Sequence, residues 1–284
     1  MNIKNILLAM LVVLFAVSCT NDDNYNDKNG DKAVIPPTGT TVKMMTYNIY
    51  GARATDPSNA ADLDALAAVI RAQDPDFVAL QEVDVFTNRT GKTVHQARDL
   101  AEKLGMEWHF SKAIDKDGGE YGDAVLSKHP ISEKLSYMLP VSAELPGENR
   151  SVSVIKVNIE GQDLYVGSTH FDHLSQETNR KLQAEELRKV VNGIEGDLIL
   201  GGDFNAFPSS ETMSIVGAYM SFGCRSGCGY TFPATNPDRL IDYILYKPIE
   251  NFAVRNYDVV DERVASDHRP IVSTLRLRIE DNAQ

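Results

Sequence analysis

The residues best suited to chemistry lie in the segment Gly201-Gly202-Asp203-Phe204-Asn205, which follows the apolar run Leu198-Ile199-Leu200. This run is predicted to be a short buried strand. Alternation along an extended backbone puts Asp203 and Asn205 on one side and Phe204 on the other. A carboxylate can orient a water, and an amide beside it can hold an oxyanion. Because Gly, Asp and Asn also form turns, the segment alone is equally compatible with an ordinary strand-to-loop turn.

Polar residues also occur in or at the ends of other predicted strands. They are Asn48, Glu82, His170, Asp242 and the pair Asp267-His268. Asp242 lies between large apolar residues, where a buried carboxylate is costly unless it is paired. Each of these residues has a structural alternative, as a turn former, a surface charge or a histidine with satisfied hydrogen bonds. Their joint occurrence favours a single functional site.

A scaffold of many strands with helices between them must position these side chains. Strands are predicted at 42–49, 77–80, 106–112, 122–128, 131–138, 150–160, 162–169, 197–200, 239–246, 252–260 and 270–279, and residues 83–93 are predicted to be a loop. Helices are predicted around Leu63–Ile70, at Ala97–Leu104, at 175–192 and near Glu211. No repeat and no second linker interrupts the pattern, so we expect one domain over residues 42–284.

The N-terminal segment has the features of an export signal. Lys4 is its only charged side chain, and the apolar run from Ile6 to Val17 is too short to span a bilayer comfortably. Cys19 follows small residues, as in a bacterial lipoprotein cleavage site, and a plain secretory signal is the alternative. Residues 1–18 are thus predicted to be a signal peptide. The Asn- and Asp-rich residues 19–41 are predicted to be a lipidated cysteine and a flexible tether.

Cys224 and Cys228 lie in a Gly-rich loop. In an exported protein this spacing favours a small disulfide. A zinc site is the rival interpretation, but it is disfavoured because no third or fourth soft ligand lies nearby.

The balance of charge bears on the partner. The formal net charge is −12, so the chain repels phosphate backbones at long range and lacks the basic surface of a nucleic-acid binder. A local cationic site or a bound metal could offset this. Nucleic acid is therefore a possible but disfavoured substrate.

Six short motifs, taken together, resemble those of the endonuclease/exonuclease/phosphatase family, whose members are phosphoesterases similar to DNase I. They are Thr46-Tyr47-Asn48-Ile49, Gln81-Glu82-Val83, Ser168-Thr169-His170, Gly202-Asp203-Phe204-Asn205, Ile241-Asp242-Tyr243 and Ser266-Asp267-His268-Arg269-Pro270. The resemblance covers residues 42–279 in the family's order. It implies an α/β (α+β) fold, a four-layer α/β/β/α sandwich with two mixed β-sheets and the active site at one rim.

The resemblance also implies a metal-dependent mechanism with Mg²⁺ or Mn²⁺. Glu82 is expected to be the main metal ligand, helped by Asn48 and, across the site, by Asp267. Hard cations of this kind take carboxylate and amide oxygens and retain several waters.

The remaining motif residues are expected to be catalytic. Asp203 is expected to orient the attacking water, and Asn205 to bind the phosphate. His268 paired with Asp267 is expected to handle protons. His170 supported by Asp242 is expected to stabilise the pentacovalent transition state. A carboxylate beside an imidazole fixes its tautomer and raises its pKa.

Five further residues have open roles. Arg89 and Arg180 are possible phosphate contacts, although a solvated helix charge is the favoured interpretation for Arg180. Asp172 and His173 either shape the substrate pocket or belong to a surface loop. Asp123 precedes a predicted strand, at a position where relatives often have Asn.

These features predict an exported, monomeric, Mg²⁺-dependent phosphoesterase that hydrolyses a phosphodiester or phosphomonoester by metal-assisted in-line attack of water. The expected substrate is a lipid head group, a sugar phosphate or an inositol phosphate. The expected location is the cell envelope, on the periplasmic face or the cell surface, through an N-terminal lipid anchor in the membrane. An extracellular nuclease (DNase) and a non-catalytic surface binding module are the alternatives.

Overall fold

A computed structural model describes residues 39–55 and 60–279 of the chain. The predicted export signal, the lipidated Cys19 and the tether up to residue 38 lie outside the described residues. None of the helices within the described ranges is long and apolar enough to cross a membrane.

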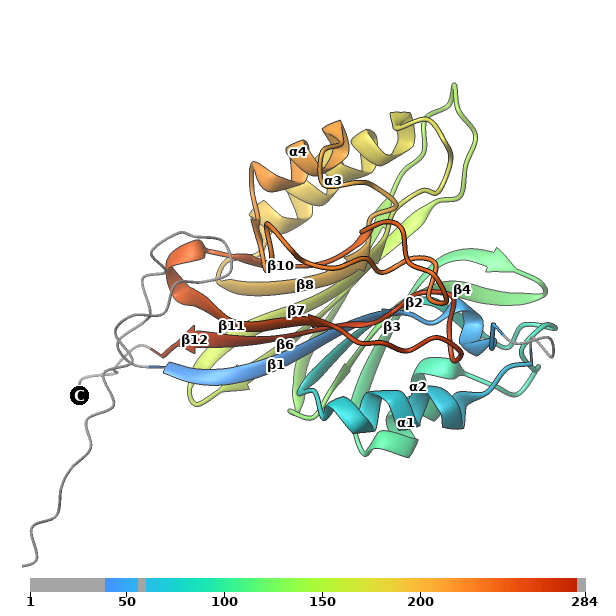
Figure 1. The fold of residues 1–284 in the computed structure, drawn as a ribbon, viewed down its shortest axis with the longest axis horizontal. Coiled ribbons are helices and arrows are strands. Elements are labelled where there is room, and N and C mark those ends of the chain that lie inside the picture. Colours follow the sequence, from blue (N-terminus) through green and yellow to red (C-terminus); the bar gives the residue numbers. More distant parts are fainter. Residues whose placement is uncertain (1–38, 56–59, 280–284) are drawn as a thin grey trace, which may run out of the picture.

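Two six-stranded sheets lie face to face (Figure 1). The first has the order β11-β12-β1-β2-β4-β3, and the second β5-β6-β7-β8-β10-β9. The strands of the first are β1 (Gly39–Asn48), β2 (Phe77–Val85), β3 (Glu107–Lys116), β4 (Gly119–Ser127), β11 (Phe252–Val259) and β12 (Ile271–Arg278). Those of the second are β5 (Ile131–Leu139), β6 (Arg150–Ile159), β7 (Gln162–His170), β8 (Asp197–Asp203), β9 (Ser221–Phe222) and β10 (Asp242–Lys247). Both sheets are mixed, because β1 and β2 run parallel, as do β7 and β8, while the other pairs are antiparallel.

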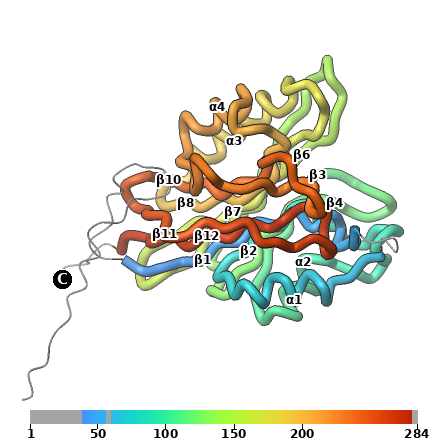
Figure 2. The backbone as a smooth tube through the Cα atoms, viewed as in Figure 1, coloured from blue at the N-terminus to red at the C-terminus, as the bar shows by residue number. Residues whose placement is uncertain are grey.

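Helices cover the two outer faces of this pair of sheets. The helices α1 (Leu63–Gln73) and α2 (Gln96–Leu104) lie on the first sheet, and α3 (Thr178–Gly193) and α4 (Glu211–Gly217) lie on the second (Figure 1, Figure 2). Two short 3₁₀ helices, η1 (Tyr50–Ala52) and η2 (Ile249–Asn251), complete the described elements. The predicted four-layer α/β/β/α sandwich is confirmed.

Local sequence explains where the helices begin and end. The Asp62 side chain accepts a hydrogen bond from the backbone N–H of Ala65 and caps α1. Asp74, in the left-handed region, ends the same helix, and Gly105 ends α2 in the same way. These boundaries agree with the sequence-based predictions.

The apolar side chains form two clusters. The larger lies between the sheets and extends under α3 and α4, with Met44, Phe77 and Leu200 among its buried members. The smaller joins the first sheet to α1 and α2 and includes Leu66 and Leu100. Both faces of the central strands are buried. Packing therefore fixes the positions of the strand ends, which carry the polar side chains.

Several predicted boundaries differ from the structure. β2 continues to Val85, into the segment predicted to be a loop, because it pairs with β4 again beyond an irregularity between Leu80 and Val83. β1 begins at Gly39, inside the segment assigned to the tether, because residues 39–41 pair with β12. Asp123 lies within β4 and does not precede it. The strand predicted from 239 begins at Asp242, and the helix predicted from 175 begins at Thr178.

Candidate active site

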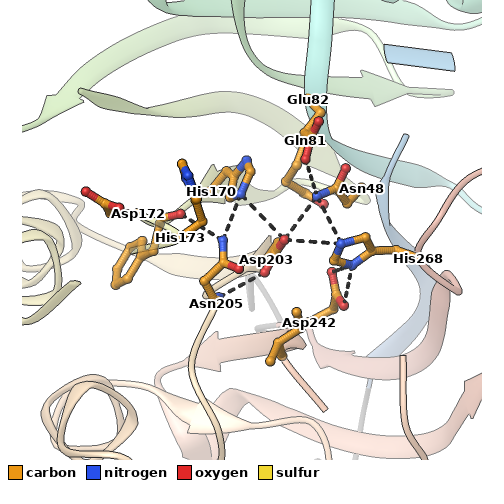
Figure 3. Close-up of polar contacts among 12 residues, drawn as sticks. Asn48, Gln81, Glu82, His170, Asp172, His173, Asp203, Asn205, Asp242 and His268 are labelled. Carbon is orange, nitrogen blue, oxygen red and sulfur yellow. Dashed lines mark hydrogen bonds and ion pairs between the residues drawn. The ribbon is translucent and has the colours of Figure 1, made fainter. Parts of the chain in front are cut away.

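The predicted site residues converge where the two sheets meet, and Figure 3 labels all of them except Asp267. Parallel pairing places Asn48 opposite Gln81, next to Glu82, and places His170 opposite Asp203. Antiparallel pairing of β10 with β8 places Asp242 opposite the same Asp203. Residues far apart in the chain are therefore brought together by strand register.

Asp203 is at the centre of the hydrogen-bond network. Its Oδ2 accepts a hydrogen bond from Nδ2 of Asn48 at 3.0 Å, across the gap between the sheets. The same oxygen lies 3.5 Å from Nε2 of His170 and 3.7 Å from Nε2 of His268. Its Oδ1 accepts from the backbone N–H of Asn205 at 2.9 Å. A single carboxylate thus contacts Asn48 of the first sheet, both histidines and the backbone of Asn205.

The segment after β8 directs Asn205 into the site by a turn and not by the predicted alternation of an extended backbone. Phe204 is buried in the core, where its ring centroid lies 4.8 Å from that of Phe171. Asn205 adopts a left-handed conformation with φ of 47°. This turn brings its Nδ2 within 3.0 Å of Nε2 of His170 and lets it donate to the carbonyl of Phe171 at 3.0 Å. Asp203 and Asn205 therefore both face the site.

The sheets approach closely just before this loop. A Cβ added at Gly201 would lie 2.8 Å from side-chain atoms of Thr46 and Ala79 in the facing sheet. Beside this contact, Nε2 of Gln81 donates to Oγ of Ser168 at 2.9 Å and joins β2 to β7. The glycine lets the strand ends that carry Asn48 and Asp203 come within hydrogen-bond distance.

The predicted pairing of histidines with carboxylates is wrong. Nδ1 of His268 contacts Asp242, at 3.0 Å from Oδ2 and 3.2 Å from Oδ1, and not its chain neighbour Asp267. Asp242 is consequently not available to His170. The reason is register, because β10 begins at Asp242 directly beside Asp203, where the ring of His268 also lies.

His170 is supported by Arg150, which the sequence analysis missed. Nη1 of Arg150 lies 3.3 Å from Nδ1 of His170, and its Nη2 lies 3.1 Å from Nδ1 of His173. Glu148 is the nearest acidic partner, 3.5 Å from Nη2. The guanidinium is almost fully buried, with the residue 2% exposed. The sequence feature that could have indicated its role is its position as the first residue of the predicted apolar strand 150–160.

These neighbours shift the pKa values of the two histidines in opposite directions. Burial disfavours a charged His268, but the carboxylates of Asp242 and Asp203 outweigh it and raise its pKa to about 10. Burial and the adjacent Arg150 together hold the pKa of His170 well below its ordinary value. Burial and Asp242 also raise the pKa of Asp203, with His268 opposing them. At neutral pH the site therefore contains a cationic His268 and a neutral His170.

Glu82 and Asp267 form the part of the site best suited to a metal ion. Glu82 lies at the irregularity of β2 with φ of 58°, and its Oε1 accepts from Nδ2 of Asn48 at 3.1 Å. Within the described residues, Oδ1 of Asp267 is buried without a hydrogen-bond partner. The pKa of Asp267 is raised to about 6, mainly by burial and in smaller part by Glu82, with His268 opposing the rise. An unpartnered carboxylate oxygen near a second carboxylate fits a hard divalent cation.

The third predicted metal ligand, Asn48, presents its amide nitrogen to Glu82 and Asp203, while its Oδ1 accepts from the backbone N–H of Tyr50 at 3.1 Å. A different group, Asp203, Asp242 and His268, has ligand atoms within 4.8 Å of one another and could also hold a metal ion. Those atoms already contact each other, so we favour Glu82 and Asp267.

The interpretation of Arg180 as a solvated charge is wrong. Arg180 is buried, and its Nη1 donates to the backbone carbonyls of Asp172 and Leu174. Asp172 is buried too, and its side chain accepts from the backbone N–H of Leu174 and from Asn179. Both residues therefore shape the loop that follows His170.

The other three open residues also have defined neighbours. Arg89 makes a bidentate contact with Asp84, in which Nε donates to Oδ2 at 2.7 Å and Nη2 donates to Oδ1 at 2.8 Å. The guanidinium of Arg89 is therefore already engaged by this carboxylate. Asp123 is buried and accepts from Oγ of Ser151. His173 is exposed at the rim, next to Arg150.

Comparison with known proteins identifies the family. The model of the Endonuclease/Exonuclease/phosphatase family matches residues 45–268. Sphingomyelinase C of Bacillus cereus is 27% identical over 196 residues, which are 58% of this chain and 57% of that protein, so the chain spans little more than half of this curated relative. An endonuclease/exonuclease/phosphatase from Beutenbergia cavernae is 28% identical with a TM-score of 0.72, covering 84% of this chain and 72% of that one. A mannosyl-6-phosphatase from Bacteroides thetaiotaomicron, at 22% identity and a TM-score of 0.65, shares the fold over 82% of this chain and 99% of its own. The chain belongs to the endonuclease/exonuclease/phosphatase family.

Proposed function

We propose that the protein is a phosphoesterase that hydrolyses a lipid phosphodiester with the help of Mg²⁺ or Mn²⁺. The observation that carries the proposal is the position of Asp203 between a cationic and a neutral histidine. A binding module has no need of two buried histidines, one cationic and one neutral, around one carboxylate. Hydrolysis uses this arrangement, because Asp203 can take up a proton, the cationic His268 can deliver one and the neutral His170 can donate a hydrogen bond to the phosphoryl group.

The phosphate is placed against Asn205 and His170. Because Arg150 donates to Nδ1 of neutral His170, the ring proton lies on Nε2. Two donors, this N–H and Nδ2 of Asn205, then meet at 3.0 Å. A phosphoryl oxygen placed between these two donors would accept a hydrogen bond from each, and its growing negative charge would be stabilised in the transition state.

Proton transfer is assigned to Asp203 and His268. Asp203, whose pKa is raised by burial, orients the attacking water and accepts its proton as the new P–O bond forms. His268, held as a cation by Asp242, donates a proton to the leaving oxygen as the old P–O bond breaks. A divalent cation held by Glu82 and Asp267 supplies charge neutralisation at the phosphoryl oxygens and the leaving group.

One observation supports a lipid substrate, and a second disfavours nucleic acid. The relative from Bacillus cereus bears the name sphingomyelinase C. The acidic balance, with a net charge of −12, disfavours nucleic acid. We further propose that the chain is an exported lipoprotein whose tether holds the domain at a membrane surface, on the basis of residues 1–41.

The test is a screen of the purified domain with Mg²⁺ or Mn²⁺ against a sphingomyelin-like lipid, inositol phosphates, a sugar phosphate, DNA and a generic phosphodiester. We expect turnover of the lipid head group, abolished by chelation and restored by the metal. Full activity in excess chelator contradicts the metal-dependent mechanism, and turnover of DNA alone favours the nuclease alternative.

Metal binding is also measurable without turnover. We expect Glu82→Gln and Asp267→Asn each to weaken Mn²⁺ binding in calorimetric titration by at least about tenfold. Glu102→Gln, which removes one exposed negative charge on α2, is the matched control and should leave the affinity unchanged. Equal affinities in all three variants would place the metal elsewhere.

A further inference from the structure

A cavity of about 840 Å³ lies outside the catalytic cluster, under the disulfide loop. Its volume is in the range of small-molecule sites, roughly 300–1,000 Å³. Its wall is mainly apolar and includes Phe207, Phe222, Tyr230, Leu240, Tyr243 and the Cys224–Cys228 disulfide. The disulfide predicted from the sequence is confirmed, and it braces one side of this cavity.

The cavity and the catalytic residues share two backbone segments. Phe207 follows Asn205 by two residues, so their Cα atoms are at most about 7 Å apart. Tyr243 follows Asp242 directly, with the side chains on opposite faces of β10. The Tyr243 hydroxyl donates to the carbonyl of Ala206 at 2.7 Å and contacts that of Leu240 at 3.2 Å. When the phosphate of a substrate lies against Asn205, a short hydrocarbon chain attached to it can therefore extend into the cavity.

The charges in the wall do not form a second anion site. Nε of Arg239 donates to Oδ1 of Asp238 at 2.6 Å, so these two ionic residues neutralise each other. Arg225, the remaining charged residue of the wall, is exposed. The buried part of the wall is aromatic and aliphatic.

Two aromatic residues of the wall are open to solvent. Phe207 is 53% exposed and Tyr230 is 56% exposed. Large apolar side chains gathered around a cavity are typical of a surface that a ligand covers. An uncharged hydrocarbon group matches this wall, because it needs no hydrogen-bond partners and gains from leaving water.

We propose that this cavity binds the hydrocarbon chain of the substrate. The inference rests on the proposed function and narrows it to amphipathic phosphodiesters, with the phosphate at Asn205 and the chain along Phe207 and Tyr230.

The test compares the methyl and dodecyl esters of one phosphodiester head group, below the micelle concentration, by release of the head group. In the wild type kcat/KM is expected to be at least about tenfold higher for the dodecyl ester, since each buried methylene contributes. The double variant Phe207→Ala, Tyr230→Ala should lower this dodecyl-to-methyl ratio at least about fivefold and leave the methyl ester unaffected. Ile249→Ala is the control, because Ile249 is equally exposed at 53% but lies in η2, outside the cavity. The same ratio in the double variant and in Ile249→Ala overturns the proposal.

A binding assay separates this proposal from the proposed function. Dansylated undecanoic acid is titrated in excess chelator, where no turnover occurs, and its fluorescence should rise with the wild type and with Ile249→Ala but not with the double variant. If neither ester is hydrolysed, the phosphoesterase proposal fails. The binding assay still shows whether the cavity binds a hydrocarbon chain. Equal probe binding by all three proteins overturns the cavity proposal alone.

Discussion

The surroundings of His170 and His268 differ in charge, although both side chains end near the same oxygen of Asp203. Around His170 the second sheet places the guanidinium of Arg150, whereas around His268 it places the carboxylate of Asp242. Burial acts on both rings in the same direction, so the ionic neighbour decides the outcome. The comparison teaches that residue type and position in the chain do not assign a catalytic role to a histidine. The charged group that contacts Nδ1 of the ring decides its protonation state and therefore its role.

Removing either ring is expected to have the largest effect. His170→Ala and His268→Ala should each lower kcat by roughly 10²-fold or more, with a much smaller change in KM, because both interactions form mainly in the transition state. Steady-state kinetics on the true substrate, together with a melting curve, measures this. A folded variant with near wild-type kcat would remove that histidine from the mechanism.

Replacing the neighbour of His170 tests the comparison more directly. Arg150→Met removes the cation beside Nδ1, so the pKa of His170 should rise and kcat should fall by about tenfold or more. The pKa is followed by NMR of the imidazole protons. Lys116→Met, which removes another positive charge that lowers the same pKa by a smaller amount, is the control. An unchanged pKa in Arg150→Met would mean that burial alone keeps His170 neutral.

Replacing the neighbour of His268 should change how stability depends on pH. The pKa of His268 is raised from 6.5 to about 10 in the folded state, so its stabilising contribution is complete below about pH 6.5 and is lost as the pH rises towards 10. Asp242→Asn weakens this shift. The fall in the free energy of unfolding between about pH 6.5 and 10 should therefore be shallower than in the wild type, as measured by urea titration. An identical slope would contradict the pairing.

The smallest effect is expected at Asp123, which lies near Arg150 on the His170 side. Burial raises the pKa of Asp123 to about 8, and the hydrogen bond from Ser151 and the charge of Arg150 only partly oppose this. An acid with a raised folded-state pKa costs stability as the pH rises from about 4 to 8. Asp123→Asn should therefore gain stability over the wild type at about pH 8 relative to about pH 5, as measured by urea titration at the two pH values. A difference that does not change with pH would exclude an ionisable Asp123.

The fold and most of the site residues could be predicted, because each motif lies at a strand end and the order of motifs along the chain resembles one family. The family and the sandwich are confirmed. The lipid anchor stays a prediction. The pairings could not be predicted, since proximity in sequence suggested Asp267 for His268, whereas strand register brings Asp242, 26 residues away. Arg150 and Arg180 were missed or misjudged for a related reason, because the sequence does not show which charged side chains the packing buries.

The close approach of the sheets at Gly201 makes this site depend on the docking of the two sheets. The hydrogen bond from Asn48 to Asp203 joins the two sheets, so neither sheet on its own contains a working set of residues. An added methyl group at Gly201 would act as a wedge between Thr46 and Ala79, two residues before Asp203. The absence of a side chain at Gly201 therefore sets how closely the two sheets approach at the active site. Recovery of activity during refolding is expected to report the docking of the two sheets.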